Sequence, residues 1–517
     1  MVGFDFDATG IAHRGHHLRI NLWAIVGTLW GAVMGLLLWA SPLQKLLPLG
    51  VEVPIIVAAL AIVSAGLTAI LFACSGFRVR KQVALAVGGA LSLGAWVIVS
   101  MWWTPSRIYA VQKTAEFFAL SLWSMVSGAV ACSVNEYCTR GFGASLLALS
   151  CVGTLRVLAG ISIDPSLGIS GLDYLVVGRL TGAGAVTLFC IALTERRRPV
   201  RRGAATAALV LFTAAMLVPG GRGPAVALAI VYMSPIVAWP RMGKRDAVDF
   251  RWYAGFLLLL GLGGVLGLMY FGAPKDNLKT IVRWLSHLEK AELGAVSSGR
   301  IDGYYLPTVV EWLKAPLFGR GIGSWPLVFG FGDALNYPHN IVLEFLFELG
   351  LVGCSMFLMI VATSLRSIVS VPNSVRSRDR AYLTLLFLFF GINSMLTADI
   401  NGNFMVFCLL GMMRGVSNFR GASRRMESFD AQHIGLMVRR LDPCGAWDRV
   451  HRMPGCSRFS RQLRCCGYGV AFIQTTSTLG DLRRVPGYSM SAYRRMSEES
   501  PSSAEYLGPD DSGRLAY

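Results

Sequence analysis

Long apolar stretches are the feature that most constrains the fold of this chain. A helix needs roughly 20 apolar residues to cross a hydrocarbon core of about 30 Å, and its backbone groups must be hydrogen-bonded within the helix. The sequence contains twelve such stretches, near residues 20–40, 54–74, 83–103, 115–134, 142–161, 172–193, 204–219, 224–239, 253–272, 340–363, 381–398 and 402–416. It therefore predicts an all-α, polytopic bundle of about twelve transmembrane helices.

Composition excludes the other classes open to a chain of 517 residues. Hydrophobic residues make up 54% of the chain and charged residues only 15%, which excludes both a string of soluble domains and a disordered chain. The eleven cysteines are scattered and give no disulfide framework. The net charge of +18 is not taken as a sign of nucleic-acid binding, because basic residues in a polytopic protein report first on the loops that face the cytoplasm.

The distribution of lysine and arginine predicts the orientation of the bundle. If the N-terminus is cytoplasmic, nineteen of these residues fall in inner loops and four in the short outer loops, namely Lys45, Arg107, Lys113 and Arg222. We therefore expect both termini in the cytoplasm. The basic start lacks a small-residue cleavage site, so no cleavable signal peptide is expected.

The predicted spans divide the chain into five parts. They are a cytoplasmic arm (1–19), spans one to nine (20–272), a large outer loop (273–338), spans ten to twelve (339–416) and a basic cytoplasmic tail (417–517). The tail is rich in arginine, has no helical or strand periodicity and matches no zinc signature. We expect it to be disordered and assign it no function.

The large outer loop should hold most of the chemistry. Apolar residues recur at helical spacing over 278–290, which predicts an amphipathic helix in the membrane interface with His287 on its polar face. A second predicted helix begins near Arg300 and carries three aromatic residues, Tyr304, Tyr305 and Trp312. These suit the aromatic belt of the interface first and a sugar-binding platform second.

A glycine-rich turn lies in the same loop. The backbone N–H groups of residues 319–323 could hold an anion. No strand precedes this turn and no P-loop lysine follows it, so nucleotide binding is not expected.

Four arginines fall at the outer end of the predicted bundle: Arg156, Arg179, Arg222 and Arg300. Arginines buried in a membrane normally face a cavity or an anion, and guanidinium groups bind pyrophosphate through paired hydrogen bonds. One alternative is that Arg156 and Arg179 snorkel to lipid head groups. Another is a structural network with acidic residues that also face outward, Asp164, Asp173 and Asp399.

His339 is the candidate general base. It lies where the large loop re-enters the membrane, after Pro338, which is preset for the start of a helix. An imidazole beside apolar walls suits proton transfer, and an interfacial histidine bonded to a backbone carbonyl is the alternative. Glu344 and Glu348 are interpreted first as packing carboxylates, because they do not follow His339 at helical spacing.

Several ordered motifs combine these residues. They are Gly221-Arg222-Gly223-Pro224-Ala225, Ser298-Gly299-Arg300, Pro316-Leu317-Phe318-Gly319-Arg320-Gly321-Ile322-Gly323, Tyr337-Pro338-His339-Asn340-Ile341-Val342-Leu343-Glu344, Glu348-Leu349-Gly350-Leu351-Val352-Gly353 and Thr397-Ala398-Asp399. Their order resembles the signature of bacterial O-antigen ligases and related polysaccharide polymerases. The resemblance covers roughly residues 205–415. Earlier helices agree mainly in number and hydropathy, and the last hundred residues carry no part of the resemblance.

The resemblance implies a GT-C-like, inverting and metal-independent glycosyltransferase of the bacterial inner membrane. Its donor would be a glycan linked to undecaprenyl pyrophosphate, used on the periplasmic side, and no cofactor is expected. Arg222 and Arg300 would hold and neutralise the pyrophosphate, and His339 would orient or deprotonate the acceptor hydroxyl. Further candidates for substrate binding are Arg156, Arg179, Arg320, Tyr337, Asn340 and Asp399.

The acceptor is open at this point. A polymerase for O-antigen or exopolysaccharide would accept another lipid-linked repeat unit, and a ligase would accept lipid A-core. We favour the polymerase slightly, because the outer loop of 66 residues (273–338) is modest in size. A flippase and a chain-length regulator of the same pathway are possible partners. A solute transporter is the alternative of another class, although the sequence shows no inverted halves.

Overall fold

The structure is a computed structural model of the chain. It describes residues 8–40, 53–77, 80–162, 174–195, 198–218, 221–238, 252–258, 260, 300–369, 377–397 and 399–418, all within the compact unit Met1–Arg420. Some predicted features lie outside the described residues. They are the interfacial helix at 278–290 with His287, most of the ninth span, Asp164, Asp173 and the tail after residue 418.

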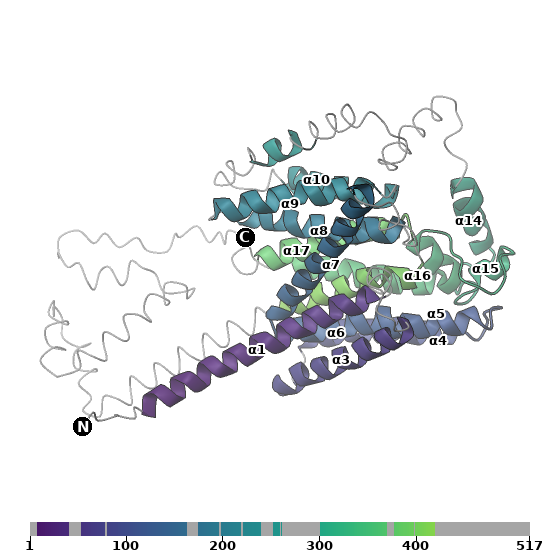
Figure 1. Cartoon of the computed structure of the whole chain (residues 1–517). Coiled ribbons are helices and arrows are strands. Elements are labelled where there is room, and N and C mark those ends of the chain that lie inside the picture. The colour runs from purple at the N-terminus through teal and green to yellow at the C-terminus, as the bar shows by residue number, and fades with distance from the viewer. Residues whose placement is uncertain are drawn as a thin grey trace, which may run out of the picture. The chain divides into compact units, whose positions relative to one another are not determined.

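Helices are the only regular secondary structure of the described residues (Figure 1). In chain order they are α1 (Ala8–Leu38), α3 (Val53–Cys74), α4 (Lys81–Ser100), α5 (Tyr109–Glu116), α6 (Trp123–Val134), α7 (Tyr137–Ser162), α8 (Tyr174–Thr194), α9 (Pro199–Leu217), α10 (Arg222–Ala238), α14 (Leu306–Trp312), α15 (Trp325–Val328), α16 (Ile341–Val369) and α17 (Ser377–Ser394). Short helical turns are η1 (Phe117–Leu122), η5 (Ile301–Tyr305) and η6 (Asn401–Asn403), and a further helix covers 404–418. The predicted all-α class is confirmed.

Seven helical stretches of the described residues are long and apolar enough to cross a membrane. They are Val53–Cys74, Lys81–Ser100, Tyr109–Val134, Tyr137–Ala159, Leu175–Thr194, Pro199–Leu217 and Ile341–Val369. Helices α1, α10, α17 and the helix at 404–418 also lie over predicted spans. These helices indicate a multi-pass membrane protein, and the number of twelve spans stays a prediction.

The first helix, α1, starts at Ala8 and continues from the predicted arm (1–19) into the first predicted span. Its contact with α7 is close because both helices carry glycine. A β-carbon on Gly31 would lie 2.1 Å from the carbonyl oxygen of Cys138, and one on Gly141 would lie 2.0 Å from that of Thr28. Only a residue without a side chain allows the two backbones to approach in this way.

Helix α16 is broken at Gly350, whose φ is +68°. In a continuous helix the N–H groups of Leu351 and Val352 would bond to carbonyls four residues earlier. They bond instead to the large loop, at the carbonyl oxygens of Pro316 (2.9 Å) and Leu317 (3.2 Å). A left-handed φ is readily adopted only by glycine, so Gly350 permits the break.

The same loop also satisfies the carbonyl groups that the break leaves free. The N–H of Arg320 donates to the carbonyl oxygen of Phe347, and the N–H of Gly321 to that of Glu348, both at 2.8 Å. Segment 316–321 therefore takes over the donors and the acceptors on both sides of the break. Irregular backbone at membrane depth is tolerated only where such groups are satisfied by protein or water.

Close packing explains a second glycine of this segment. Gly319 has a φ of +72°, and a β-carbon there would lie 2.6 Å from the carbonyl carbon of Glu348. A side chain at this position would push segment 316–321 away from α16. The motif that the sequence presents as a flexible turn is thus the element that completes the broken helix.

The predicted outer loops meet at one end of the bundle. The carboxylate of Asp333, in the large loop, accepts hydrogen bonds from the hydroxyl of Ser106 (2.5 Å) and the backbone N–H of Ile108 (2.9 Å). Close by, the hydroxyl of Thr104 donates to the carbonyl oxygen of Ile322 (2.8 Å). The loop after α4 is therefore fixed to the large loop, next to the start of α5.

Candidate functional site

A buried turn that follows α17 is the centre of the candidate site, and we call it the acidic turn (residues 395–397 and 399–403). Asp399 shapes this turn: its Oδ1 accepts the N–H of Gly402 (2.7 Å), and its carbonyl oxygen accepts Nδ2 of Asn403 (2.8 Å). Its other carboxylate oxygen accepts the hydroxyl of Tyr109 (3.4 Å). These bonds build the turn and join it to α5, and they differ from the arginine network considered above.

Two predicted site residues of the large loop and of α16 are anchored on the acidic turn. Nη1 of Arg300 donates to the carbonyl oxygen of Leu396 (2.6 Å). Nδ2 of Asn340 donates to the carbonyl oxygen of Met395 (3.3 Å). These residues come from different parts of the sequence, so the acidic turn brings Arg300 and the start of α16 together.

Arg179 reaches the same turn from α8. Its Nη2 donates to the hydroxyl of Thr397 (2.5 Å), and its Nη1 donates to the carbonyl oxygen of Gly402 (3.3 Å). These contacts make Arg179 a tether that joins α8 to the acidic turn, which is a third role beside the two predicted from its sequence position.

Arg222 is the first residue of α10, and its side chain is exposed. The surroundings of the next residue, Gly223, show what the start of this helix packs against. A β-carbon on Gly223 would lie 3.3 Å from Cγ2 of Thr397 and 3.6 Å from Cβ of Leu396. The start of α10 therefore packs on the acidic turn, beside the residues that Arg179 and Arg300 contact.

His339 lies between two tyrosine rings at the start of α16. Its ring is 4.7 Å from that of Tyr337 and 5.3 Å from that of Tyr304, in edge-to-face arrangements. Among the described residues, the imidazole makes ring contacts and no hydrogen bond. The predicted alternative, a histidine bonded to a backbone carbonyl, is therefore not what the structure contains.

The backbone of His339 is unusual. Its φ is +60°, and among the described residues only Phe77 shares a positive φ without being glycine. Such conformations are costly for residues with a β-carbon and cluster at functional sites. The next residue, Asn340, caps α16, because its Oδ1 accepts the N–H groups of Val342 (3.0 Å) and Leu343 (3.1 Å).

The surroundings of His339 favour a neutral imidazole. Burial lowers the pKa of His339 below its usual 6.5, and the positive charge of Arg300 lowers the pKa further. A neutral imidazole has a free nitrogen lone pair at pH 7, which a general base needs. The same influence of Arg300 indicates that His339 and Arg300, two of the three predicted catalytic residues, lie near each other.

Other predicted substrate-binding residues have different partners. Arg320 pairs with Glu311 (3.2 Å) on α14. Arg156 lies in α7, and its buried Nε has no hydrogen-bond partner in the described part of the chain. No contact recorded for Arg156 joins it to the acidic turn. Of the four arginines predicted to converge, Arg179 and Arg300 contact the acidic turn, and Arg222 begins the helix whose next residue packs on it.

The tyrosines of the second predicted helix in the large loop face inward. The ring of Tyr304 stacks on Trp325 (5.8 Å), and the hydroxyl of Tyr305 donates to the carbonyl oxygen of Met395 (3.5 Å). We predict an interface belt first for these tyrosines. In the structure Tyr304 contacts His339, and Tyr305 contacts the acidic turn.

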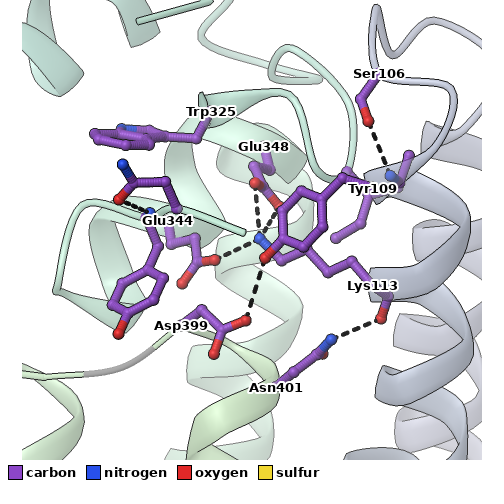
Figure 2. A network of polar contacts seen from close by, with 12 residues as sticks. Ser106, Tyr109, Lys113, Trp325, Glu344, Glu348, Asp399 and Asn401 are labelled. Carbon is purple, nitrogen blue, oxygen red and sulfur yellow. Dashed lines mark hydrogen bonds and ion pairs between the residues drawn. The ribbon is translucent and has the colours of Figure 1, made fainter. Parts of the chain in front are cut away.

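A buried ionic cluster lies beneath the start of α16 (Figure 2). Lys113 on α5 bonds to Glu344, and its Nζ lies 2.8 Å from both carboxylate oxygens of Glu348. All three side chains are 0% exposed. The carboxylate of Glu348 also accepts the N–H of Gly323. This cluster holds α5, α16 and the large loop together.

Sequence reasoning misses this cluster for two reasons. Lys113 is predicted in a short outer loop, whereas it lies inside α5 within the apolar stretch Tyr109–Val134. The second reason is that the positions of Glu344 and Glu348 are considered relative to His339 and not relative to each other. Their spacing of four residues places both carboxylates on one face of α16, and this is the signal that could have indicated a shared cation.

The predicted anion-binding turn is already occupied by protein. The N–H groups of Arg320 and Gly321 bond to α16, and the N–H of Ile322 bonds to the hydroxyl of Ser100 (3.3 Å). These donors are therefore used to hold the large loop on α16 and α4. Anion binding at this end of the bundle has to rely on the arginine side chains.

The described residues include no group of three or more histidine, cysteine, aspartate or glutamate side chains placed to hold a metal ion. Comparison of the chain with protein-family models gives no match, and comparison with curated proteins gives none either. The assignment of a function therefore rests on the geometry of the site and on the motifs that form it.

Proposed function

We propose that the chain is a membrane-embedded glycosyltransferase that uses a glycan linked to a polyprenyl pyrophosphate. The observation that carries the proposal is that Arg300 and Asn340, the neighbour of His339, both donate to the acidic turn. The pKa of His339 is lowered by burial and by Arg300. A neutral base next to a fixed cation is the pair that transfer from a pyrophosphate donor requires.

In the proposed reaction an acceptor hydroxyl attacks the anomeric carbon of the donor sugar. The bond from that carbon to the pyrophosphate oxygen breaks, the configuration inverts, and the hydroxyl proton passes to Nδ1 or Nε2 of His339. The leaving pyrophosphate gains negative charge, which Arg300 and Arg222 stabilise. A positioned base contributes about 10² to 10⁴-fold, and fixed cations in a site of low dielectric supply further stabilisation.

The arginines have separate tasks in this proposal. Arg179 bonds to the hydroxyl of Thr397 and the carbonyl oxygen of Gly402, so it supports the turn against which the donor lies. Arg222 is exposed at the start of α10. Arg300 uses one N–H group to donate to the carbonyl oxygen of Leu396. A guanidinium has five N–H donors, so Arg300 keeps others for a phosphate.

The setting proposed for this activity is the bacterial inner membrane, with the acidic turn on the periplasmic side and both termini in the cytoplasm. Undecaprenyl pyrophosphate is the proposed lipid carrier. A polymerase for O-antigen or exopolysaccharide is slightly favoured over a ligase that transfers glycan to lipid A-core. A flippase and a chain-length regulator are the proposed partners in the pathway.

A solute transporter is the second candidate, because the broken helix α16 and the buried charges of Lys113, Glu344 and Glu348 are features that transporters use. Transporter sites typically lie at the bilayer midplane between two halves of the protein. Here Arg179, Arg300 and Asn340 all contact one turn at one end of the bundle. This favours a site open to one side of the membrane.

Deletion of the gene separates the candidates. A polymerase leaves single lipid-linked repeat units, and a ligase leaves full-length lipid-linked polymer that is not transferred to lipopolysaccharide. A transporter leaves all glycans unchanged. The glycans and their lipid carriers would be separated by gel electrophoresis and identified by mass spectrometry.

Complementation with variants then tests the site. We expect His339→Ala and Arg300→Ala to abolish transfer while the protein still inserts in the membrane. Lys314→Ala is the matched control, because Lys314 lies in the same loop, is 58% exposed and pairs with Glu311. Transfer at the wild-type rate in both site variants would refute the mechanism.

A further inference from the structure

An exposed apolar stripe runs along α14 and the turn that follows it. Leu306, Val310 and Leu313 are all at least half exposed. Their spacing of four and three residues places them on one face of the helix. The stripe continues into Leu317 and Phe318, which are 56% and 55% exposed. A contiguous apolar surface of this kind marks an interaction site in a folded protein.

The other face of α14 is fixed to the body of the protein. Thr308 is fully buried, and its hydroxyl accepts a hydrogen bond from Nε1 of Trp325 (2.9 Å). At one edge of the stripe, Glu311 forms ion pairs with Lys314 and Arg320. The helix therefore has a buried side, a charged edge and an apolar side that no described residue covers.

At Phe318 the stripe meets two tryptophans, one on α4 and one in the loop that follows it. Phe318 contacts Trp96 (5.8 Å) and Trp103 (6.3 Å), and these two tryptophans contact each other (5.7 Å). Trp96 belongs to the span Lys81–Ser100. Its Nε1 donates to the carbonyl oxygen of Leu349, directly before the break in α16.

The length of α16 beyond Gly350 matches one crossing of a membrane. The part beyond Gly350 runs from 351 to 369, which is 19 residues of the printed range Ile341–Val369. At about 1.5 Å per residue this part spans roughly 29 Å, close to the thickness of a hydrocarbon core. Trp102, at the end of α4, is 91% exposed, as expected of a tryptophan in the aromatic belt.

We propose that the apolar stripe of α14 binds the lipid bilayer itself, with its leucines and Phe318 in the interfacial layer at the end of the bundle that carries the acidic turn. Helices with one apolar and one polar face lie in this layer, with the apolar face just below the head groups. The stripe then holds the large loop, and His339 with it, at the height of lipid head groups. This inference concerns the membrane and does not require transfer activity.

Site-specific photocrosslinking tests the proposal. p-Benzoylphenylalanine would replace Leu313 in the full chain, reconstituted in nanodiscs of phosphatidylethanolamine and phosphatidylglycerol. Mass spectrometry after irradiation would count lipid adducts on the peptide. The matched control is Lys314, which is the next residue and 58% exposed. The positive control is Met359, which is 60% exposed on the spanning part of α16.

We expect about tenfold more lipid adduct at position 313 than at position 314, because an interfacial helix buries only its apolar face. Position 310 should behave like position 313. The proposal is overturned if positions 310 and 313 give no lipid adducts while position 359 does, or if they crosslink mainly to a second copy of the chain. Gel filtration of each variant before reconstitution checks that the protein is folded.

Discussion

Lys113 and Glu348 form a fully buried ion pair in which Nζ of the lysine lies 2.8 Å from both oxygens of the carboxylate. Glu344 binds the same ammonium group, so one cation serves two carboxylates. Ion pairs in such surroundings are weak evidence for stability by themselves, yet the loss of one partner is costly because the other charge stays buried. The cluster therefore fixes α5 to the start of α16, and we call this contact the ionic lock.

Replacing Lys113 by methionine should destabilise the protein strongly. The Lys113→Met variant leaves Glu344 and Glu348 buried without their cation, which costs about 3–5 kcal/mol. Thermal unfolding in detergent, followed by circular dichroism, would measure the loss. The triple variant Lys113→Met, Glu344→Gln, Glu348→Gln removes all three charges and should recover most of the stability. Equal unfolding temperatures of Lys113→Met and the wild type would contradict the ionic lock.

Alanine at Gly350 should disrupt the break in α16. Gly350 has a φ of +68°, and a β-carbon there would lie 2.2 Å from the carbonyl oxygen of Leu317. The unfavourable backbone conformation alone costs on the order of 1–3 kcal/mol. The matched control is Gly391→Ala on α17, where the nearest atoms are 3.9 Å from the new β-carbon. This control should be neutral or slightly stabilising. Similar unfolding temperatures for both variants would disprove the role given to Gly350.

Acid should release the contact between the large loop and the loop before α5. Hydrogen bonds from Ser106 and from the backbone N–H groups of Ile108, Arg107 and Tyr109 lower the pKa of Asp333 from 3.8 to about 2. Because the folded pKa lies below the unfolded value, this stabilisation is complete above pH 3.8 and is lost as the pH falls toward 2. Hydrogen exchange at Ile108 and Tyr109 should accelerate over this range. In Asp333→Asn the exchange should be fast already at neutral pH, and slow exchange in that variant would argue against the contact.

The titration of His339 should depend on Arg300. Burial and the positive charge of Arg300 lower the pKa of His339 below 6.5, so the neutral imidazole predominates at pH 6.5 and above. In Arg300→Gln the pKa should rise, because the charge is removed while burial remains. Nuclear magnetic resonance of ring-labelled histidine would follow the titration without any substrate. Arg320→Gln is the control, because Arg320 has no recorded influence on His339. An unchanged pKa of His339 in Arg300→Gln would show that the two residues do not interact.

The helices were predictable because their apolar stretches follow directly from the thickness of a bilayer. The end at which the functional residues meet was also predictable, since alternation of the spans places Arg179, Arg222, Arg300 and His339 at the same end. In the structure Arg179 and Arg300 contact the acidic turn, as do the direct neighbours of Arg222 and His339, Gly223 and Asn340. The number of spans and the side of the membrane stay predictions.

Other features required coordinates. The exchange of hydrogen bonds between segment 316–321 and α16 involves backbone groups, which have no sequence pattern of their own. Lys113 was predicted in a loop because a charged residue does not fit a stretch of apolar residues. Glu344 and Glu348, four residues apart, could have indicated a buried partner for it. Tyr304 was ambiguous for another reason: an aromatic ring suits an interface and a site wall equally well.

The broken helix α16 has a consequence for how the chain matures in a membrane. A helix with all its hydrogen bonds internal can insert alone, whereas four backbone groups around Gly350 find their partners on segment 316–321. Since that segment is synthesised just before α16, both partners are present as soon as the tenth predicted span leaves the ribosome. Insertion of this span and closure of the loop over it should therefore be one concerted step in biogenesis.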